Sequence, residues 1–358
     1  MFISLTLVKR HYANMGVDYE LPNDNRKYIL GNSSSSIDEL EILQQKEDTH
    51  LSRTRRVKAV LYGVGAVGSL IATELLRRKG VEAVGAVDTA EEKVGKDLGD
   101  VIGLGRHLGT AVSNDIDSVL SKVDADIVVH ATSSFLKDVY SQIVAVIKNG
   151  VSVVSTCEEL SYPYATDRRS AEEIDRLAKE HGVTVLGAGI NPGFLMDTLV
   201  IVLTSVCQKI NRIEVKRVMN ATTRRAPFQK KIGAGLTVGE FEEKMRTKII
   251  TGHVGLEQSI MMIADALGWK LGGIQVNAVE PIIADRSTQT QAAKVEPGCV
   301  AGLRQTAMGM KRGKPIIVLD FQAYVGATEE YDSITIDGTP AIHEKISPCI
   351  HGDIGTVA

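Results

Sequence analysis

From residue 57 onward, short apolar runs alternate with segments in which apolar positions recur at helical spacing. Five runs are almost entirely apolar, which is typical of strands buried on both faces of a sheet: "VKAVLYG", "VEAVGAVD", "ADIVVHAT", "VSVVST" and "VTVLGAG". Helices are predicted between them, one of which starts at Ser170, where "SAEE" matches a capping box. Since strands that alternate with helices form parallel sheets, we expect a doubly wound α/β domain over residues 55–195.

A different pattern begins at residue 196. Helices are predicted within "LMDTLVIVLTSVC", "TVGEFEEKMRTKI" and "GLEQSIMMIADALGW", and a strand within "RIEVKRVMNAT". The later runs "QVNAVEPIIA", "PIIVLDFQAYVG" and "DSITIDG" are rich in β-branched residues and indicate an open mixed or antiparallel sheet. We therefore expect residues 196–358 to form an α+β domain for substrate binding and dimerisation. A bare sheet face needs covering, so a homodimer through this sheet is predicted.

Residues 1–54 lack this regular pattern. The initial "MFISLTLV" is apolar, but it is too short to span a bilayer and lacks the flanks of a signal peptide. The remainder is polar, rich in serine in its middle and without sustained periodicity. Residues 1–54 are therefore expected to be a flexible extension.

Composition argues against several classes of protein. The 358 residues carry a net charge of -3, which gives no electrostatic footprint for nucleic acid or a membrane surface. The four cysteines are scattered without a C-x-x-C pair, so neither a disulfide framework nor a zinc site is expected. The histidines show no metal-ligand spacing, and we predict no metal. A reducing cytoplasm is the expected location.

The turn after the first strand, "YGVGAVG", carries a dinucleotide-binding pattern. Gly63 permits the tight turn, Gly65 lets a pyrophosphate approach the helix N-terminus, and Gly68 lets the helix pack on the strand. Asp88 follows Gly68 by 20 residues at the end of the second strand, where a carboxylate binds ribose hydroxyls. This context predicts a Rossmann domain that binds NAD or NADP. The alternative is a structural glycine turn without a ligand.

Asp88 favours NAD, because its carboxylate would repel a 2'-phosphate, whereas Lys93 and Lys96 keep NADP open. The stretch "HATSS", residues 130–134, ends another strand and either lines the nicotinamide ribose or forms a simple turn. The predicted cofactor-binding residues are Gly63, Gly65, Ala66, Val67, Gly68, Asp88, Ala131, Thr132, Ser133 and Asn191.

A pair of carboxylates follows the run "VSVVST". If ligands bind beyond the carboxyl ends of the strands, Glu158 or Glu159 faces the nicotinamide. There a carboxylate accepts a proton from an amine or water and stabilises a cationic iminium. The alternative is that both side chains begin a loop in solvent. Cys157 beside them is expected to be a small buried filler rather than a reactive thiol.

Further candidates follow the last strand of the first domain. The stretch "GINPGF" is predicted to form a rigid turn at a hinge and cleft wall, with Ile190 and Phe194 on the substrate side. The stretch "TRRAPFQKKIGAGLT" is either a solvated loop or a loop in which Arg224 or Arg225 holds a substrate carboxylate. His253 opens a helix and is interpreted as its cap, with a catalytic role as the alternative.

The chain resembles the 2,4-diaminopentanoate dehydrogenase family and its relatives the native amine dehydrogenases, within the dihydrodipicolinate-reductase-like group. The likeness covers residues 56–358 and rests on five motifs: "YGVGAVG", "STCEEL", "GINPGF", "TRRAPFQKKIGAG" and "HGDIGTVA". It implies NAD(P)-dependent oxidative deamination at C4 of 2,4-diaminopentanoate, which gives 2-amino-4-oxopentanoate and ammonia in ornithine degradation. It also implies a catalytic glutamate in the "CEE" stretch, assigned first to Glu158 and second to Glu159.

The chain departs from that family pattern in two places. The extension over residues 1–54 has no counterpart, and relatives continue beyond "HGDIGTVA" with a helix that returns to the nucleotide domain. We therefore expect exposed apolar surface where that helix would pack.

Other functions stay open: an amine dehydrogenase for simple amines or ketones, or a regulator that binds NAD and catalyses nothing. Dihydrodipicolinate reductase and homoserine dehydrogenase fit less well, because a histidine pair and a lysine, respectively, are missing.

Overall fold

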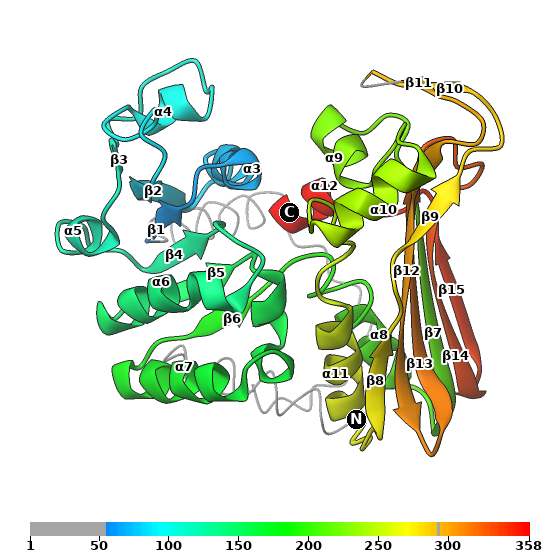
Figure 1. The fold of residues 1–358 in the computed structure, drawn as a ribbon. Coiled ribbons are helices and arrows are strands. Elements are labelled where there is room, and N and C mark those ends of the chain that lie inside the picture. The colour runs from blue at the N-terminus through cyan, green and yellow to red at the C-terminus, as the bar shows by residue number, and fades with distance from the viewer. Residues whose placement is uncertain (1–54, 292–293) are drawn as a thin grey trace, which may run out of the picture. The chain divides into compact units, whose positions relative to one another are not determined.

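Six parallel strands form the sheet of the first domain (Figure 1). The computed structural model describes residues 55–291 and 294–358, so the extension predicted for residues 1–54 lies outside the described residues. The strand order is β3-β2-β1-β4-β5-β6, with the topological switch point between β1 and β4, where ligands bind beyond the strand ends. The strands are β1 (Val57–Tyr62), β2 (Val81–Val87), β3 (Val112–Ser113), β4 (Ile127–His130), β5 (Ser152–Ser155) and β6 (Val185–Gly187).

Helices cover both faces of this sheet. One apolar core packs the sheet against α5, α6 and α7 and contains Val128, Ile143 and Val153. A second core packs it against α3 and α4 through Leu61 and Ala72. The predicted doubly wound Rossmann domain is therefore confirmed. Its helical elements are α3 (Ala66–Leu75), α4 (Leu98–Val101), α5 (Ile116–Leu120), α6 (Leu136–Lys148), η1 (Glu158–Ser161), η2 (Pro163–Ala165) and α7 (Arg168–His181).

The start predicted for α7 at Ser170 is wrong. The N-cap is Asp167, whose carboxylate accepts a hydrogen bond from the Arg169 N–H at 3.1 Å. The Ser170 hydroxyl donates to the same carboxylate at 2.6 Å, so the serine supports the cap instead of forming it. Aspartate caps a helix as well as serine does, and the sequence pattern did not distinguish the two.

A seven-stranded mixed sheet forms the second domain, in the order β15-β14-β7-β13-β12-β8 with β9 also paired to β12. Strands β7 and β13 run parallel, while β12 and β13 run antiparallel. The sheet is thus mixed, one of the two forms predicted. Its strands are β7 (Lys209–Asn220), β8 (Gly273–Val276), β9 (Glu280–Ile283), β12 (Val300–Lys311), β13 (Lys314–Tyr324), β14 (Tyr331–Thr339) and β15 (Ile342–Ile346), and a separate pair comprises β10 (Thr288–Gln289) and β11 (Lys294–Val295).

Figure 1 shows the helices α8 to α11 on one face of this second sheet. Apolar side chains of α8 and α11 pack on inward residues such as Val215 and Leu319, and those of α9 and α10 pack in a second cluster that contains Met219 and Ala323. On the opposite face, Tyr331 lies near the ammonium groups of Lys216 and Lys345, and no described helix covers it. The homodimer through this face stays a prediction. The helices are α8 (Thr198–Thr204), α9 (Ala226–Lys231), α10 (Val238–Arg246), α11 (Leu256–Ala266) and α12 (Gly352–Val357).

Helix α12 makes a contact that the sequence led us to expect to be missing. It packs against α3, and the backbone carbonyl of Ala358 accepts a hydrogen bond from Arg78 at 2.9 Å. Residues Arg56–Ala358 accordingly form one compact unit. Ile354 of α12 is 66% exposed. Among the helices of the described ranges, none combines the length and apolar character that a membrane span requires.

Candidate active site

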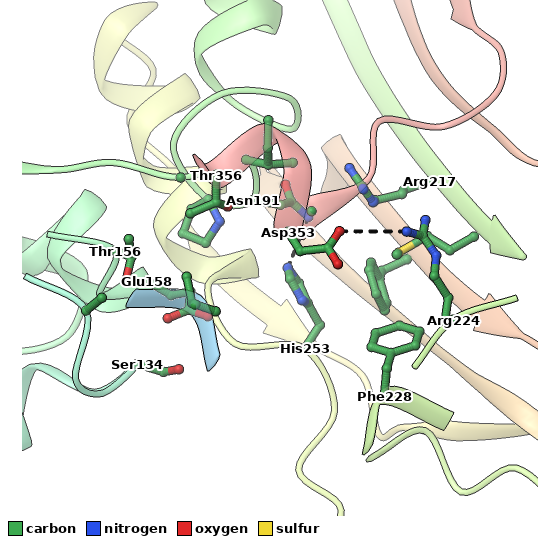
Figure 2. A pocket seen from close by; sticks show the side chains of 18 of the residues that line it. Ser134, Thr156, Glu158, Asn191, Arg217, Arg224, Phe228, His253, Asp353 and Thr356 are labelled. Carbon is green, nitrogen blue, oxygen red and sulfur yellow. Dashed lines mark hydrogen bonds and ion pairs between the residues drawn. The ribbon is translucent and has the colours of Figure 1, made fainter. Parts of the chain in front are cut away.

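A pocket of about 380 Å³ lies beyond the carboxyl ends of β4, β5 and β6, facing β7, β13 and α12 (Figure 2). Its walls therefore come from both domains. The lining residues are Val67, Ala131, Thr132, Ser133, Ser134, Thr156, Glu158, Gly189, Ile190, Asn191, Pro192, Arg217, Met219, Arg224, Arg225, Phe228, His253, Phe321, Gly352, Asp353 and Thr356.

The pocket brings together many of the predicted site residues. Those that line it are Val67, Ala131, Thr132, Ser133, Glu158, Ile190, Asn191, Arg224 and Arg225. Those that do not line it are Gly63, Gly65, Ala66, Gly68, Asp88, Glu159 and Phe194. Phe194 is 41% exposed, so its predicted place on the substrate side is not supported.

The glycine turn has the properties of a pyrophosphate cradle. A Cβ at Gly63 would clash with the carbonyl of Ala131, and one at Gly68 would clash with the carbonyl of Gly63. A Cβ at Gly65 would meet nothing within 4 Å, and Gly65 is the N-cap of α3. Two glycines thus permit close packing, while the third leaves open space at a helix N-terminus, where a phosphate group binds well. The residues present fit a dinucleotide.

Asp88 adjoins this turn. Its Oδ2 atom accepts hydrogen bonds from the Val64 N–H and from the Lys93 ammonium, both at 2.9 Å, and its Oδ1 atom accepts one from the Ala90 N–H. Burial alone would raise the pKa of Asp88, but these donors outweigh it, and the pKa is lowered. The carboxylate is therefore ionised, with a lysine that offsets part of its charge.

The two adjacent glutamates have different surroundings, although both begin the turn η1. Glu158 lines the pocket together with Ser134 and Thr156 (Figure 2). Glu159 accepts a hydrogen bond from the Leu136 N–H at 2.6 Å, at the N-terminus of α6. Cys157 is buried, and burial raises the pKa of its thiol to about 12, so its interpretation as a buried filler is confirmed.

Arg217 of β7 is a pocket residue that the sequence did not reveal. Its side chain is only 2% exposed, and its Nη1 atom lies 3.6 Å from Oδ1 of Asp332. Neither of these two atoms has a hydrogen-bond partner in the described part of the chain, while Nη2 donates to the carbonyl of Ile350. Burial raises the pKa of Asp332, and the facing guanidinium offsets this only in part.

Arg224 lies between two carboxylates. Its Nη2 atom is 3.2 Å from Oε1 of Glu330, and its Nη1 atom is 3.8 Å from Oδ1 of Asp353 (dashed line in Figure 2). The side chain is 10% exposed, and its buried Nε atom has no partner among the described residues. Arg225 also lines the pocket and is the N-cap of α9. Glu158 and Arg224 lie on opposite walls of the pocket (Figure 2).

His253 lies in the pocket and is not a helix cap, so that interpretation is wrong. The N-cap of α11 is Gly255. The imidazole of His253 stacks on Phe321, with ring centroids 4.4 Å apart, and its Nε2 atom lies 3.0 Å from the Asn191 amide nitrogen. Because an amide nitrogen only donates, Nε2 is the acceptor and the ring is neutral.

Electrostatics agree with this assignment. Burial, assisted by the positive charges of Arg217 and Lys231, lowers the pKa of His253 to about 3. The imidazole is therefore uncharged across the physiological range. In the described ranges, no cluster of three or more His, Cys, Asp or Glu side chains is arranged to hold a metal ion.

One signal for Arg217 was present in the sequence. Ile213, Val215, Arg217 and Met219 alternate along one strand and share its inward face, so a charged residue occupies an apolar position there. Such a residue is a candidate for a site, because buried charges need partners. Asp353 had no comparable local signal.

Comparisons with known proteins agree with this geometry. Residues 194–358 match the family model of the 2,4-diaminopentanoate dehydrogenase C-terminal domain, and residues 57–186 match that of the dihydrodipicolinate reductase N-terminus. The chain is 35% identical over 308 residues to 2,4-diaminopentanoate dehydrogenase of Acetoanaerobium sticklandii, which covers 85% of this chain and 87% of that protein. The resemblance predicted from the five motifs is confirmed.

Two amine dehydrogenases are also similar. The enzyme of Streptomyces virginiae is 24% identical over 271 residues, 74% of each chain. The solved structure of the amine dehydrogenase from Mycobacterium smegmatis superposes with a TM-score of 0.71 at 30% identity, which covers 85% of this chain and 90% of that one.

Proposed function

The chain belongs to the 2,4-diaminopentanoate dehydrogenase family, and on that premise we propose that it catalyses NAD(P)-dependent oxidative deamination of 2,4-diaminopentanoate at C4. The products are 2-amino-4-oxopentanoate, ammonia and reduced cofactor. The observation that carries the proposal is the position of Glu158 at the strand ends, in one pocket with Arg217 and Arg224 on the opposite wall. A carboxylate suited to amine chemistry and cations suited to a substrate carboxylate thus share a pocket.

The nucleotide-binding half supplies the cofactor site. When bound, NAD or NADP accepts the hydride that leaves C4. Gly65 and the N-terminus of α3 hold the pyrophosphate, and Asp88 holds the ribose hydroxyls. Thr132 and Ser133, which line the pocket, are assigned to the nicotinamide ribose. The buried Oδ1 atom of Asn191 has no hydrogen-bond partner within the described residues, so it is an available acceptor there.

Glu158 is assigned the proton transfers. An aliphatic amine is protonated at neutral pH and releases hydride only as the neutral amine, so the reaction needs a base. Glu158 takes that proton and passes it to solvent, and the carboxylate, negatively charged again, then stabilises the iminium left when the C4–H bond breaks. Water adds to C4, both of its protons pass to the nitrogen through Glu158, and the C–N bond breaks. A ketone and ammonium remain.

The second domain is assigned the rest of the substrate. Arg217 and Arg224 carry buried N–H groups without acceptors in the described part of the chain, and Arg225 adds a third positive charge to the same wall. A carboxylate would satisfy these donors by a charge-assisted contact. Met219 and Phe228 provide apolar surface for the carbon chain.

A second candidate is an amine dehydrogenase for simple amines. Phe228, Phe321 and Met219 favour it, since they give part of the pocket an apolar wall. In that case the arginines would contact no substrate group.

A substrate screen with the full chain tests both candidates. Reduction of NAD and of NADP is followed by absorbance with 2,4-diaminopentanoate, with 2-aminopentane and without an amine. We expect the highest kcat/KM with 2,4-diaminopentanoate. Equal kcat/KM for the two amines would favour the second candidate. Tight binding of NADH without reduction of either cofactor by any amine would instead indicate a regulator and overturn the proposal.

A further inference from the structure

We propose that Arg224 and Asp353 together bind the α-amino-acid end of the substrate, with Arg224 on the α-carboxylate and Asp353 on the α-ammonium. The inference rests on the proposed function and names the feature that would separate a diamino acid from a simple amine. It assigns a specificity-determining role to the C-terminal helix α12, which supplies Asp353.

The surroundings of Asp353 leave its carboxylate available to a cation. Its Oδ1 atom accepts a hydrogen bond from the Ile354 N–H at 3.0 Å and lies 3.8 Å from Nη1 of Arg224, beyond hydrogen-bond distance. Its Oδ2 atom has no hydrogen-bond partner in residues 55–291 and 294–358. The side chain is 34% exposed and lines the pocket. Asp353 therefore offers an unused acceptor to a ligand.

The surroundings of Arg224 leave it short of an acceptor. Glu330 occupies Nη2, but Nε is buried and has no partner in the described part of the chain. A buried donor that stays unpaired destabilises the protein, so a ligand oxygen at this place would be stabilising. Since the group is a guanidinium, a carboxylate is the ligand that fits best.

The spacing of the two charges fits an α-amino acid. An α-carboxylate and an α-ammonium are bonded to the same carbon, so they need a cation and an anion that lie close together. The 3.8 Å between Nη1 of Arg224 and Oδ1 of Asp353 meets that requirement. In 2,4-diaminopentanoate the second nitrogen is bonded to C4, which is two bonds from C2, and the proposed orientation directs it to the side where Figure 2 shows Glu158.

A purely structural role for Asp353 has a different signature. If it only positioned Arg224, its loss would lower kcat/KM for every substrate that carries a carboxylate. If it binds the ammonium, its loss lowers kcat/KM only for substrates that carry both a carboxylate and an α-ammonium. Glu330 provides a matched control, because it contacts Arg224 at 3.2 Å and does not line the pocket.

Three substrates separate these roles: 2,4-diaminopentanoate, 4-aminopentanoate without the α-ammonium, and 2-aminopentane without either group. In wild type we expect kcat/KM to fall in that order. Asp353→Asn should reduce the preference for 2,4-diaminopentanoate over 4-aminopentanoate at least about tenfold, a change of about 1.4 kcal/mol, and keep the preference for 4-aminopentanoate over 2-aminopentane. Arg224→Gln should abolish the latter. Glu330→Gln should lower kcat/KM for both carboxylate-bearing substrates by the same factor, so that the ratio of the two kcat/KM values does not change.

A binding measurement supplies a readout that does not depend on turnover. Calorimetric titration of the NADH-saturated protein uses 2-aminopentanoate and pentanoate, neither of which has a nitrogen at C4. Wild type should bind 2-aminopentanoate more tightly, and Asp353→Asn should bind the two ligands equally. Circular dichroism of each variant checks its fold.

Failure of this inference can be distinguished from failure of the proposed function. If wild type oxidises all three amines with equal kcat/KM, this inference is overturned while amine oxidation stands. If Asp353→Asn lowers kcat/KM for both carboxylate-bearing substrates by the same factor, Asp353 only positions Arg224 and the inference is again overturned. If no amine reduces either cofactor, the proposed function fails, and the titration still decides whether the pair binds an α-amino acid.

Discussion

The backbone N–H of Leu136 donates a hydrogen bond to the carboxylate of Glu159 at 2.6 Å. That carboxylate lies at the N-terminus of α6, where the helix dipole favours negative charge. The preceding residue, Glu158, lines the pocket instead. One strand end thus supplies two carboxylates with different surroundings, one at a helix N-terminus and one in the pocket.

Exchange of each glutamate for glutamine should separate their assigned roles. Glu158→Gln is expected to lower kcat for amine oxidation at least about a hundredfold without changing the unfolding midpoint, because an amide cannot accept the proton. Glu159→Gln is expected to lower the free energy of unfolding by about 1 kcal/mol and to change kcat little. Steady-state kinetics and urea unfolding of both variants check this. Full activity of Glu158→Gln would remove its assigned role.

The glycine turn offers a second pair of variants. Gly65→Ala should keep the stability of the protein, since its Cβ meets nothing within 4 Å, but should weaken NADH binding at least about tenfold because the methyl group enters the space for the pyrophosphate. Gly68→Ala should lower stability, because its Cβ would clash with the carbonyl of Gly63. NADH fluorescence titration and thermal unfolding measure the two effects. Undiminished NADH affinity in Gly65→Ala would contradict the assigned cradle.

The pH dependence of stability should reveal His253. Its pKa is about 3 in the folded protein against the ordinary 6.5, so below pH 6.5 the unfolded chain binds a proton that the folded chain does not. Stability therefore falls as the pH drops through this window. Between pH 7 and pH 5 wild type should lose up to about 2 kcal/mol more than His253→Gln. Urea unfolding of both proteins at the two pH values checks this, and equal losses would exclude a depressed pKa.

The nucleotide-binding half was largely predictable because its signals are local. Apolar runs predict the strands. The spacing of Gly63, Gly65, Gly68 and Asp88 indicates a nucleotide-binding turn after the first strand. Strand β12 was missed, because glycines interrupt its apolar pattern. Gly302 stands where a Cβ would clash with the backbone of Ala323 on the neighbouring strand. Glycine is needed at position 302 because of the tertiary packing of the neighbouring strand, which a local sequence pattern does not show.

The substrate side of the pocket depends on long-range packing. Arg224, His253 and Asp353 come from a loop after β7, a loop before α11 and the last helix, and only the folded chain brings them together. Local patterns predicted a substrate contact for Arg224 and a helix cap for His253, and no role for Asp353. For His253 the neighbouring helix start favoured a cap, whereas stacking on Phe321 and contact with Asn191 place it in the pocket.

Arg217 forms a buried pair with Asp332 and also lines the pocket. Both residues also bind the backbone of Ile350, directly before α12. Arg217→Met or Asp332→Asn alone leaves the other residue's buried charge without its partner, and Arg217→Met should cost about 3–5 kcal/mol of unfolding free energy.

The double variant Arg217→Met/Asp332→Asn separates the two contributions of Arg217. It removes both charges while asparagine still accepts from the Ile350 N–H, so it should be more stable than Arg217→Met. Its kcat/KM for 4-aminopentanoate relative to 2-aminopentane should nevertheless stay as low as in Arg217→Met, because both variants lack one of the two guanidinium groups proposed to contact the substrate carboxylate. Urea unfolding measures the first quantity and steady-state kinetics the second. Recovery of the carboxylate preference together with stability would show that Arg217 only supports the fold and contacts no substrate.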